Sequence, residues 1–285
     1  MGLSKFLRRQ TERWVDARLG PEYEEATRAL AVRQNEYGFD PFGFHRDSLR
    51  YAALIARFFY RDWFRTETFG LEQLPRSGGL LLVANHSGQL PFDGVCIGAS
   101  MLLDAHPPRL VRTMVERFVP AVPFASYLFN RWGQITGTPD NCRRLLADGA
   151  TILVFPEGAR GISKPFSERY RLQDFGLGFM RLALQANTPI IPVAVIGAEE
   201  QAPAVNLKPL ARALGLPAFP VVPFPPFFPL VPLPTRYRLH FGAPLTFTGD
   251  PDDDDETITD KVRVVKSSIQ SLIQLGLEER KNVFW

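Results

Sequence analysis

The chain has 285 residues, which is enough to bury a full hydrophobic core in one large or two small domains. Its formal net charge of +3 gives no strong case for nucleic-acid binding. Hydrophobic residues make up 45% of the chain, but no uninterrupted apolar stretch reaches the roughly 20 residues that a membrane-spanning helix needs. This composition fits either an ordinary soluble protein or one attached to one face of a membrane.

Residues 1–66 are expected to form an N-terminal amphipathic helical region without a signal peptide, since no apolar run follows the first charges. In a helix over 50–65, one side would carry Arg50, Arg57, Arg61 and Arg65, and the other Tyr51, Leu54, Ile55, Phe58 and Phe59. Such a helix either lies in a lipid interface or packs its apolar side on the domain behind it. Residues 3–19 allow the same two interpretations.

From residue 67 to 285 the pattern alternates between strands and helices. Apolar runs bounded by turn residues predict strands at 79–84, 110–114, 151–155, 190–196 and 237–241. Helix-like stretches lie between them, near 94–103, 140–149, 174–187 and 259–275. This order predicts an α/β fold with a mixed, largely parallel sheet flanked by helices.

The segment Asn85-His-Ser-Gly-Gln-Leu-Pro-Phe-Asp93 places an imidazole and a carboxylate within reach of each other. His86 follows a predicted strand, and α/β sites usually lie at the carboxyl ends of strands. An imidazole suits a general base near neutral pH, and Asp93 can orient it through the other ring nitrogen. Taken alone, the pair fits a structural role as well as a catalytic one.

A second motif, Phe155-Pro-Glu-Gly158, follows the apolar run 151–154 and precedes a charged loop that contains Arg160. Glycine permits close backbone approach, and arginine can bind a phosphate group through two hydrogen bonds. The structural alternative is a glutamate, Glu157, that caps a turn among ordinary surface bases.

Residues 217–234 contain eight prolines interleaved with apolar side chains, which excludes both a helix and a central strand. Because a loop this apolar is costly to leave in water, we expect it to cover the core, line a lipid tunnel or dip into a bilayer surface.

The two motifs, in this order and at this separation, resemble those of the glycerolipid acyltransferase family, whose best-known members acylate 1-acylglycerol-3-phosphate. The resemblance covers about 70–270 and implies that 67–285 is an acyltransferase domain with His86 and Asp93 as catalytic residues. It also implies that Glu157, Gly158 and Arg160 bind the acceptor. Arg131, in Asn130-Arg-Trp-Gly133, lies where the family keeps an arginine-containing substrate-binding block.

One feature departs from the family pattern. Six residues separate His86 from Asp93, two more than in the family's commonest spacing. With this spacing, the chain resembles a divergent branch of the lysophospholipid acyltransferase superfamily.

The resemblance implies an O-acyltransferase that moves a fatty acyl chain from acyl-CoA or acyl carrier protein to a lysophospholipid hydroxyl. It would need no metal and no cofactor, would bind no nucleic acid, and would sit peripherally on the cytoplasmic face of a membrane. Two alternatives stay open: a neutral glyceride or alcohol as acceptor, and a non-catalytic lipid-binding module.

Overall fold

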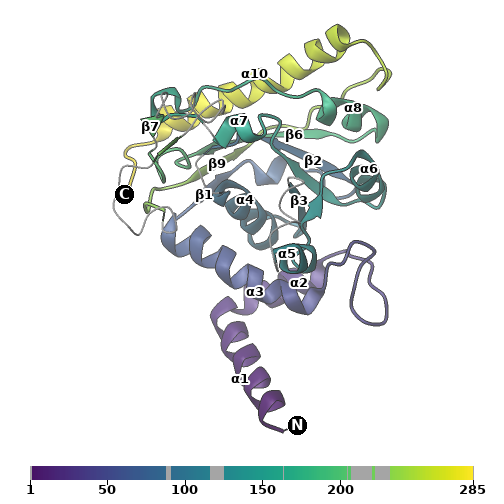
Figure 1. The fold of residues 1–285 in the computed structure, drawn as a ribbon, viewed down its shortest axis with the longest axis vertical. Coiled ribbons are helices and arrows are strands. Elements are labelled where there is room, and N and C mark those ends of the chain that lie inside the picture. The colour runs from purple at the N-terminus through teal and green to yellow at the C-terminus, as the bar shows by residue number, and fades with distance from the viewer. Residues whose placement is uncertain are drawn as a thin grey trace.

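A computed structural model describes residues 2–87, 91–115, 125–162, 164–203, 205–206, 220–221 and 232–284. Most of the proline-rich segment 217–234 lies outside these residues. The expected fold class is confirmed, because helices flank a mixed, largely parallel sheet (Figure 1).

The strands of the main sheet are β1 (Glu67–Phe69), β2 (Leu80–Ala84), β3 (Val111–Val115), β4 (Ile135–Thr136), β5 (Thr151–Val154), β6 (Ile190–Ile196) and β9 (Arg238–Phe241). A separate ribbon pairs β7 (Val205–Asn206) with β8 (Pro220–Val221). The α-helices are α1 (Gly2–Leu19), α2 (Pro21–Ala29), α3 (Arg46–Arg57), α4 (Phe92–Leu103), α5 (Ala125–Arg131), α6 (Pro139–Ala147), α7 (Ala159–Ile162), α8 (Gly178–Gln185) and α10 (Asp255–Glu279). The π-helical segment η1 (Phe58–Trp63) extends α3, and η2 (Leu71–Gln73) and η4 (Phe166–Glu168) are 3₁₀ turns.

The main sheet has the strand order β1-β9-β6-β2-β5-β3-β4. β2 lies at its centre and pairs in parallel with both β5 and β6, while β9 runs antiparallel to β6. Every residue of β2 and β6 is buried, as expected for strands that are covered on both faces. The parallel pairing brings the carboxyl ends of β2, β5 and β6 to one edge of the sheet.

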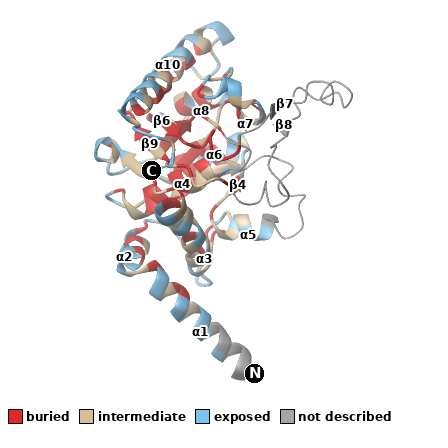
Figure 2. Cartoon of the chain, turned by 90° about the vertical axis from the view of Figure 1, so that its left-hand side faces the viewer, coloured by how far each residue is buried: buried red, intermediate tan, exposed pale blue. Residues whose placement is uncertain are grey.

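Two apolar cores cover the faces of the sheet. Leu81 and Val83 pack with residues of α6, α8 and α10, whereas Leu80 and Leu82 pack with α4 and η1. This alternation follows from the two-residue period of a strand. Figures 1 and 2 show α10 and α4 on opposite sides of the largely buried sheet.

The N-terminal helices form a third layer outside α4, through a core that includes Val15, Leu19, Leu49 and Leu102. The expectation that residues 1–66 are helical is wrong for 30–45, which form turns and extended backbone. Over 40–44 the reason is local, since the Asp40 carboxylate accepts hydrogen bonds from the backbone amides of Phe42 and Phe44, each at 2.8 Å.

The predicted apolar side of α3 and η1 is only partly buried. Ala53 and Tyr60 face the core, but Tyr51, Ile55 and Phe58 are exposed, Ile55 by 49%. The helix therefore packs through a side that is rotated away from the predicted one. Trp14 of α1 is also exposed, and α1 extends away from the body of the protein (Figure 1).

Three arginines of α3 and η1 are engaged in ion pairs. Arg50 pairs with Asp16 at 3.1 Å, Arg57 with Asp62 at 3.7 Å, and Arg61 with Asp104. Among the helices of the described ranges, none is both long enough and apolar enough to cross a membrane.

Asn85 extends the pairing of β2 with β6 beyond the last residue of β2. Its Nδ2 donates to the Val195 carbonyl at 3.1 Å, and its Oδ1 accepts from the Val195 amide at 2.7 Å. Asn85 is fully buried, and its side chain takes the place of a neighbouring strand's backbone as the hydrogen-bond partner of Val195. It does so at the position immediately before His86.

We expect Asn85→Ala to lower the free energy of unfolding by about 2–4 kcal/mol, because both backbone groups of Val195 lose their partner. Urea denaturation monitored by circular dichroism measures the change. Gln274→Ala on the exposed side of α10 is the control and should change stability by less than about 0.5 kcal/mol. Equal midpoints for both variants would contradict the structural role of Asn85.

Candidate active site

The two sequence motifs meet at the carboxyl edge of the sheet. β2 and β5 run in register from Leu80 opposite Thr151 to Val83 opposite Val154, so the loops that follow them lie side by side. The backbone amide of His86 donates to Glu157 Oε1 at 2.9 Å. The parallel pairing thus explains why residues 71 positions apart in the chain share one site.

His86 and Asp93 are in direct contact, with 2.6 Å between His86 Nδ1 and Asp93 Oδ2. Asp93 lies in the first turn of α4 and is fully buried. Its carboxylate also accepts from the backbone amides of Ser87 at 3.2 Å and Gly94 at 2.7 Å. The longer spacing between the two residues therefore still allows the side chains to meet.

The hydrogen bond to Asp93 determines the tautomer of His86. Because the carboxylate is an acceptor, the proton lies on Nδ1, and Nε2 is free to accept a proton. Burial by itself lowers the pKa of His86, but the charge and hydrogen bond of Asp93 outweigh it, and the pKa is raised above its ordinary value of 6.5. Glu157 adds to this rise and Lys164 opposes it.

The His86 ring is also held by packing. It stacks on Phe155 with a centroid distance of 4.1 Å and an interplanar angle of 20°. On another side it meets α7, where a Cβ added to Gly161 would lie 2.8 Å from both the Cβ and the carbonyl oxygen of His86. The side chain keeps 14% of its surface exposed, so the imidazole remains accessible.

Glu157 was predicted to bind an acceptor, and this role stays a prediction. Its side chain is fully buried. Oε1 accepts from the His86 amide, and Oε2 accepts from the Gln173 amide at 2.7 Å. Lys164 Nζ lies 3.6 Å from Oε2.

The other predicted binding residues occupy two places. Gly158 forms the turn after β5 with a φ of 55°, a conformation that favours glycine. Arg160 follows in α7, is exposed, and donates to the Asp174 carbonyl at 3.0 Å. Arg131 lies at the end of α5, where its guanidinium packs over the rings of Phe39 and Tyr127. Their roles in binding also stay predictions.

A buried polar network behind the site was not predicted from the sequence. Lys164 reaches Glu199 at 3.1 Å, and the Tyr170 hydroxyl donates to Glu200 at 2.5 Å. Arg280 of the C-terminal segment contacts both Glu200 and the Tyr170 hydroxyl. Burial raises the pKa of Glu199, and Lys164 opposes the rise. The sequence feature that could have indicated this network is the pair Glu199 and Glu200, which follows the apolar strand β6 after two residues.

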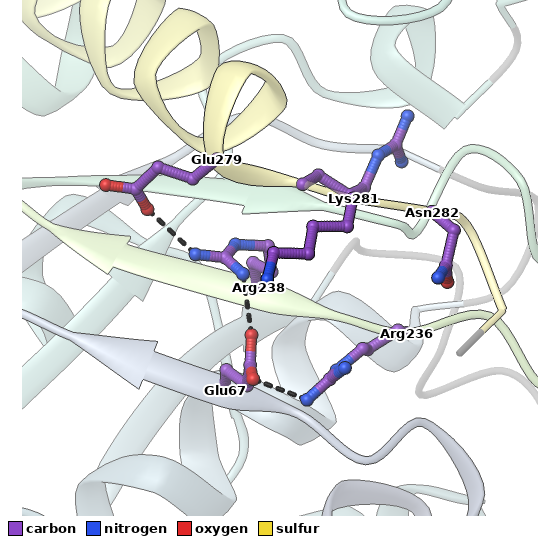
Figure 3. Close-up of a pocket in the computed structure, with 7 residues that line it drawn as sticks. Glu67, Arg236, Arg238, Glu279, Lys281 and Asn282 are labelled. Atoms are coloured by element: carbon purple, nitrogen blue, oxygen red, sulfur yellow. Dashed lines mark hydrogen bonds and ion pairs between the residues drawn. The ribbon is translucent and has the colours of Figure 1, made fainter.

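Two pockets lie away from the dyad. One, of about 290 Å³, is where β1, β9 and the end of α10 meet (Figure 3). There Arg236 and Arg238 pair with Glu67, and Arg238 also pairs with Glu279. The other, of about 760 Å³, is lined by residues at the amino ends of β2, β3 and β5, opposite the edge that carries His86. In the described part of the chain, no cluster of three His, Cys, Asp or Glu side chains could hold a metal ion.

This arrangement can perform general base catalysis on a hydroxyl group. Such a base needs a ring nitrogen that can accept a proton, which is Nε2 of His86. It also needs a group that orients the ring, which is the buried Asp93 carboxylate, and the pKa of His86 is raised. The contacts of the site therefore suit proton removal from a hydroxyl by His86.

Comparisons with known proteins indicate the family of the chain. The family model described as Acyltransferase matches residues 65–196. Uncharacterized proteins of Mycobacterium tuberculosis and Mycobacterium leprae are each 41% identical to the chain, over 88% of its length and 71% and 70% of theirs.

Two further similarities carry more specific names. The DGAT1/2-independent enzyme synthesizing storage lipids of Homo sapiens is 27% identical over 74% of this chain and 61% of its own. The crystal structure of the 1-acyl-sn-glycerophosphate (LPA) acyltransferase PlsC from Thermotoga maritima matches with a TM-score of 0.55 and 16% identity, covering 83% of each chain. This last match shows a shared fold.

We expect Gly161→Ala to reduce turnover about 100-fold while the protein stays folded, because the added methyl group displaces the backbone and side chain of His86. Steady-state kinetics and the thermal midpoint measure the two effects. Gly98→Ala in α4 is the matched control, since its Cβ would meet nothing within 4 Å. Similar rates for the two variants would show that α7 does not fix His86.

Proposed function

Because the chain belongs to the glycerolipid acyltransferase family, we propose that it transfers a fatty acyl chain from acyl-CoA or acyl carrier protein to the hydroxyl of a lysophospholipid such as 1-acylglycerol-3-phosphate. The observation that carries the proposal is the contact between His86 Nδ1 and the buried Asp93 carboxylate at the carboxyl edge of the sheet.

In the proposed reaction, His86 Nε2 takes the proton of the acceptor hydroxyl as the oxygen attacks the thioester carbonyl. Asp93 holds the ring and stabilises the imidazolium that forms. The tetrahedral intermediate then breaks its carbon–sulfur bond, and the departing thiolate receives the proton from His86. The products are the ester and the free thiol, and no covalent enzyme intermediate forms.

A phosphorylated acceptor is favoured by the surroundings of the dyad. Arg160 is exposed in α7, three residues after Glu157, and a guanidinium can bind a phosphate group. Gly158 keeps the turn between them free of a side chain.

A neutral acceptor is the second candidate, and one specific observation favours it. The human protein that resembles this chain is named for the synthesis of storage lipids. With a glyceride or a long-chain alcohol, the same dyad would act on the hydroxyl, and Arg160 would contribute little to acceptor binding.

We further propose that the protein binds peripherally to a membrane from which its lipid acceptor comes. Tyr51, Ile55 and Phe58 of α3 and η1, with Trp14 of α1, give this region exposed apolar side chains that suit a lipid interface. Acyl-CoA and acyl carrier protein are cytoplasmic donors, which favours the cytoplasmic face.

The function is tested by measuring thiol release from acyl-CoA or acyl carrier protein with lysophosphatidate, monoacylglycerol or lysophospholipids as acceptor. We expect acceptor-dependent release that is lost in His86→Ala and falls about 10³–10⁴-fold in Asp93→Asn. Activity should decline at low pH as His86 is protonated, with a midpoint above 6.5. In Asp93→Asn this midpoint should move to lower pH, because the charge that raises the pKa is removed.

Arg160→Ala separates the two acceptor classes. A large increase in KM for lysophosphatidate supports the phosphorylated acceptor, while unchanged kinetics with monoacylglycerol as the better substrate supports the neutral one. If wild type releases no thiol with any donor and acceptor, the proposed reaction is wrong, and a lipid-binding module becomes the better explanation.

For the membrane, we expect the triple variant Tyr51→Ser/Ile55→Ser/Phe58→Ser to lose co-sedimentation with phosphatidylglycerol-containing vesicles, because it removes exposed apolar surface without altering the core. The control is Val264→Ser/Leu275→Ser, which changes exposed apolar residues of α10. Undiminished sedimentation of the triple variant would exclude this surface as the binding site.

A further inference from the structure

Lys164 is a buried cation that the proposed reaction does not use. Its side chain is 3% exposed, and it follows α7, which packs against His86. Its Nζ lies 3.6 Å from Glu157 Oε2 and 3.1 Å from Glu199 Oε1, and donates to the Arg171 carbonyl at 3.2 Å. A buried ammonium is costly unless it is paired and hydrogen-bonded, and here each partner supplies an acceptor.

The two carboxylates that Lys164 joins are themselves bound to backbone amides. Glu157 accepts from His86 and Gln173, and Glu199 accepts from Tyr170 at 2.9 Å. The ammonium of Lys164 therefore contacts the loops after β5 and β6, and Glu157 extends the connection to His86 in the loop after β2. The same network binds the backbone of His86 itself.

We infer that Lys164 is a positioning residue for His86 and acts through Glu157. In this role Glu157 links Lys164 to the backbone of His86 instead of binding the acceptor. The inference rests on the proposed function. Glu157 has no exposed surface for a ligand, and both of its oxygens accept from backbone amides, one of which belongs to the residue that carries the imidazole. A shift of this carboxylate would shift the His86 backbone.

The charges that face His86 predict pKa shifts that distinguish a positioning role of Lys164 from a purely structural one. They are Asp93 on α4, Glu157 after β5 and Lys164 after α7. Glu157 raises the pKa of His86, and Lys164 lowers it. Removing Lys164 should therefore raise the pKa of His86, and removing the charge of Glu157 should lower it. A general loosening of the fold gives no reason for opposite shifts.

The experiment compares Lys164→Met and Glu157→Gln with wild type in two measurements. The first is steady-state kinetics over pH, where we expect kcat to fall about 100-fold in each variant, with KM for the acceptor nearly unchanged. The second is an NMR titration of the His86 ring in the 285-residue chain, which has four histidines, with the His86 signal identified by its loss in His86→Ala.

We expect the His86 titration and the acid side of the rate profile to move to higher pH in Lys164→Met and to lower pH in Glu157→Gln. The double variant Lys164→Met/Glu157→Gln should titrate close to wild type but remain slow. Lys261→Met is the control. It removes a lysine of α10 that pairs with Asp253 at 3.2 Å, and it should change neither measurement.

Should Lys164→Met fail to fold only because Glu199 is left without its partner, the variant Lys164→Met/Glu199→Gln covers that case. It removes one charge of each sign, and the expected rise in the His86 pKa is the same. An unchanged titration of His86 in folded variants, or a rise in acceptor KM with unchanged kcat in Glu157→Gln, would overturn the inference. Opposite titration shifts in a protein that shows no acyl transfer would instead support the link from Lys164 through Glu157 to His86 and contradict the proposed function.

Discussion

The parallel pairing of β2 with β5 and β6 is the constraint on which the candidate site depends. Three loops leave these strands at one edge of the sheet, and each carries a buried polar group close to the strand end. Asn85 binds the backbone of β6, His86 binds Glu157 after β5, and Glu199 after β6 binds Lys164. The apolar strands thus set the distance between groups that are far apart in the chain.

Around this edge, polar contacts are made mostly between side chains and backbone. Asp93 binds the amides of Ser87 and Gly94 as well as the His86 ring, and Glu157 binds two amides. Such bonds hold loop backbones as firmly as they hold side chains, because each removes an otherwise unpaired amide. A general base that must keep its geometry in a loop benefits from this arrangement.

The sequence allowed the sheet to be anticipated because its central strands β2, β5 and β6 are almost entirely apolar and bounded by glycine, proline and polar residues. The predicted strands at 79–84, 151–155 and 190–196 differ from β2, β5 and β6 by at most one residue at either end. The short strands β1 and β4 were missed, since two or three residues carry no usable periodicity. The helical prediction failed over 30–45, where Asp40 directs a turn through its own side chain.

Apolar patterning was enough to predict the fold class, and the residue types of the two motifs, at short spacing, indicated the acyltransferase family. The burial of Glu157 against backbone amides and its link through Lys164 to Glu199 became visible only in the folded chain, where Asp93 also contacts His86 as the sequence led us to expect. Those contacts link residues 7, 71 and 35 positions apart, and chain separation alone does not indicate which polar groups meet. For the contact between His86 and Glu157, the register of β2 and β5 is decisive, because it places the two following loops side by side.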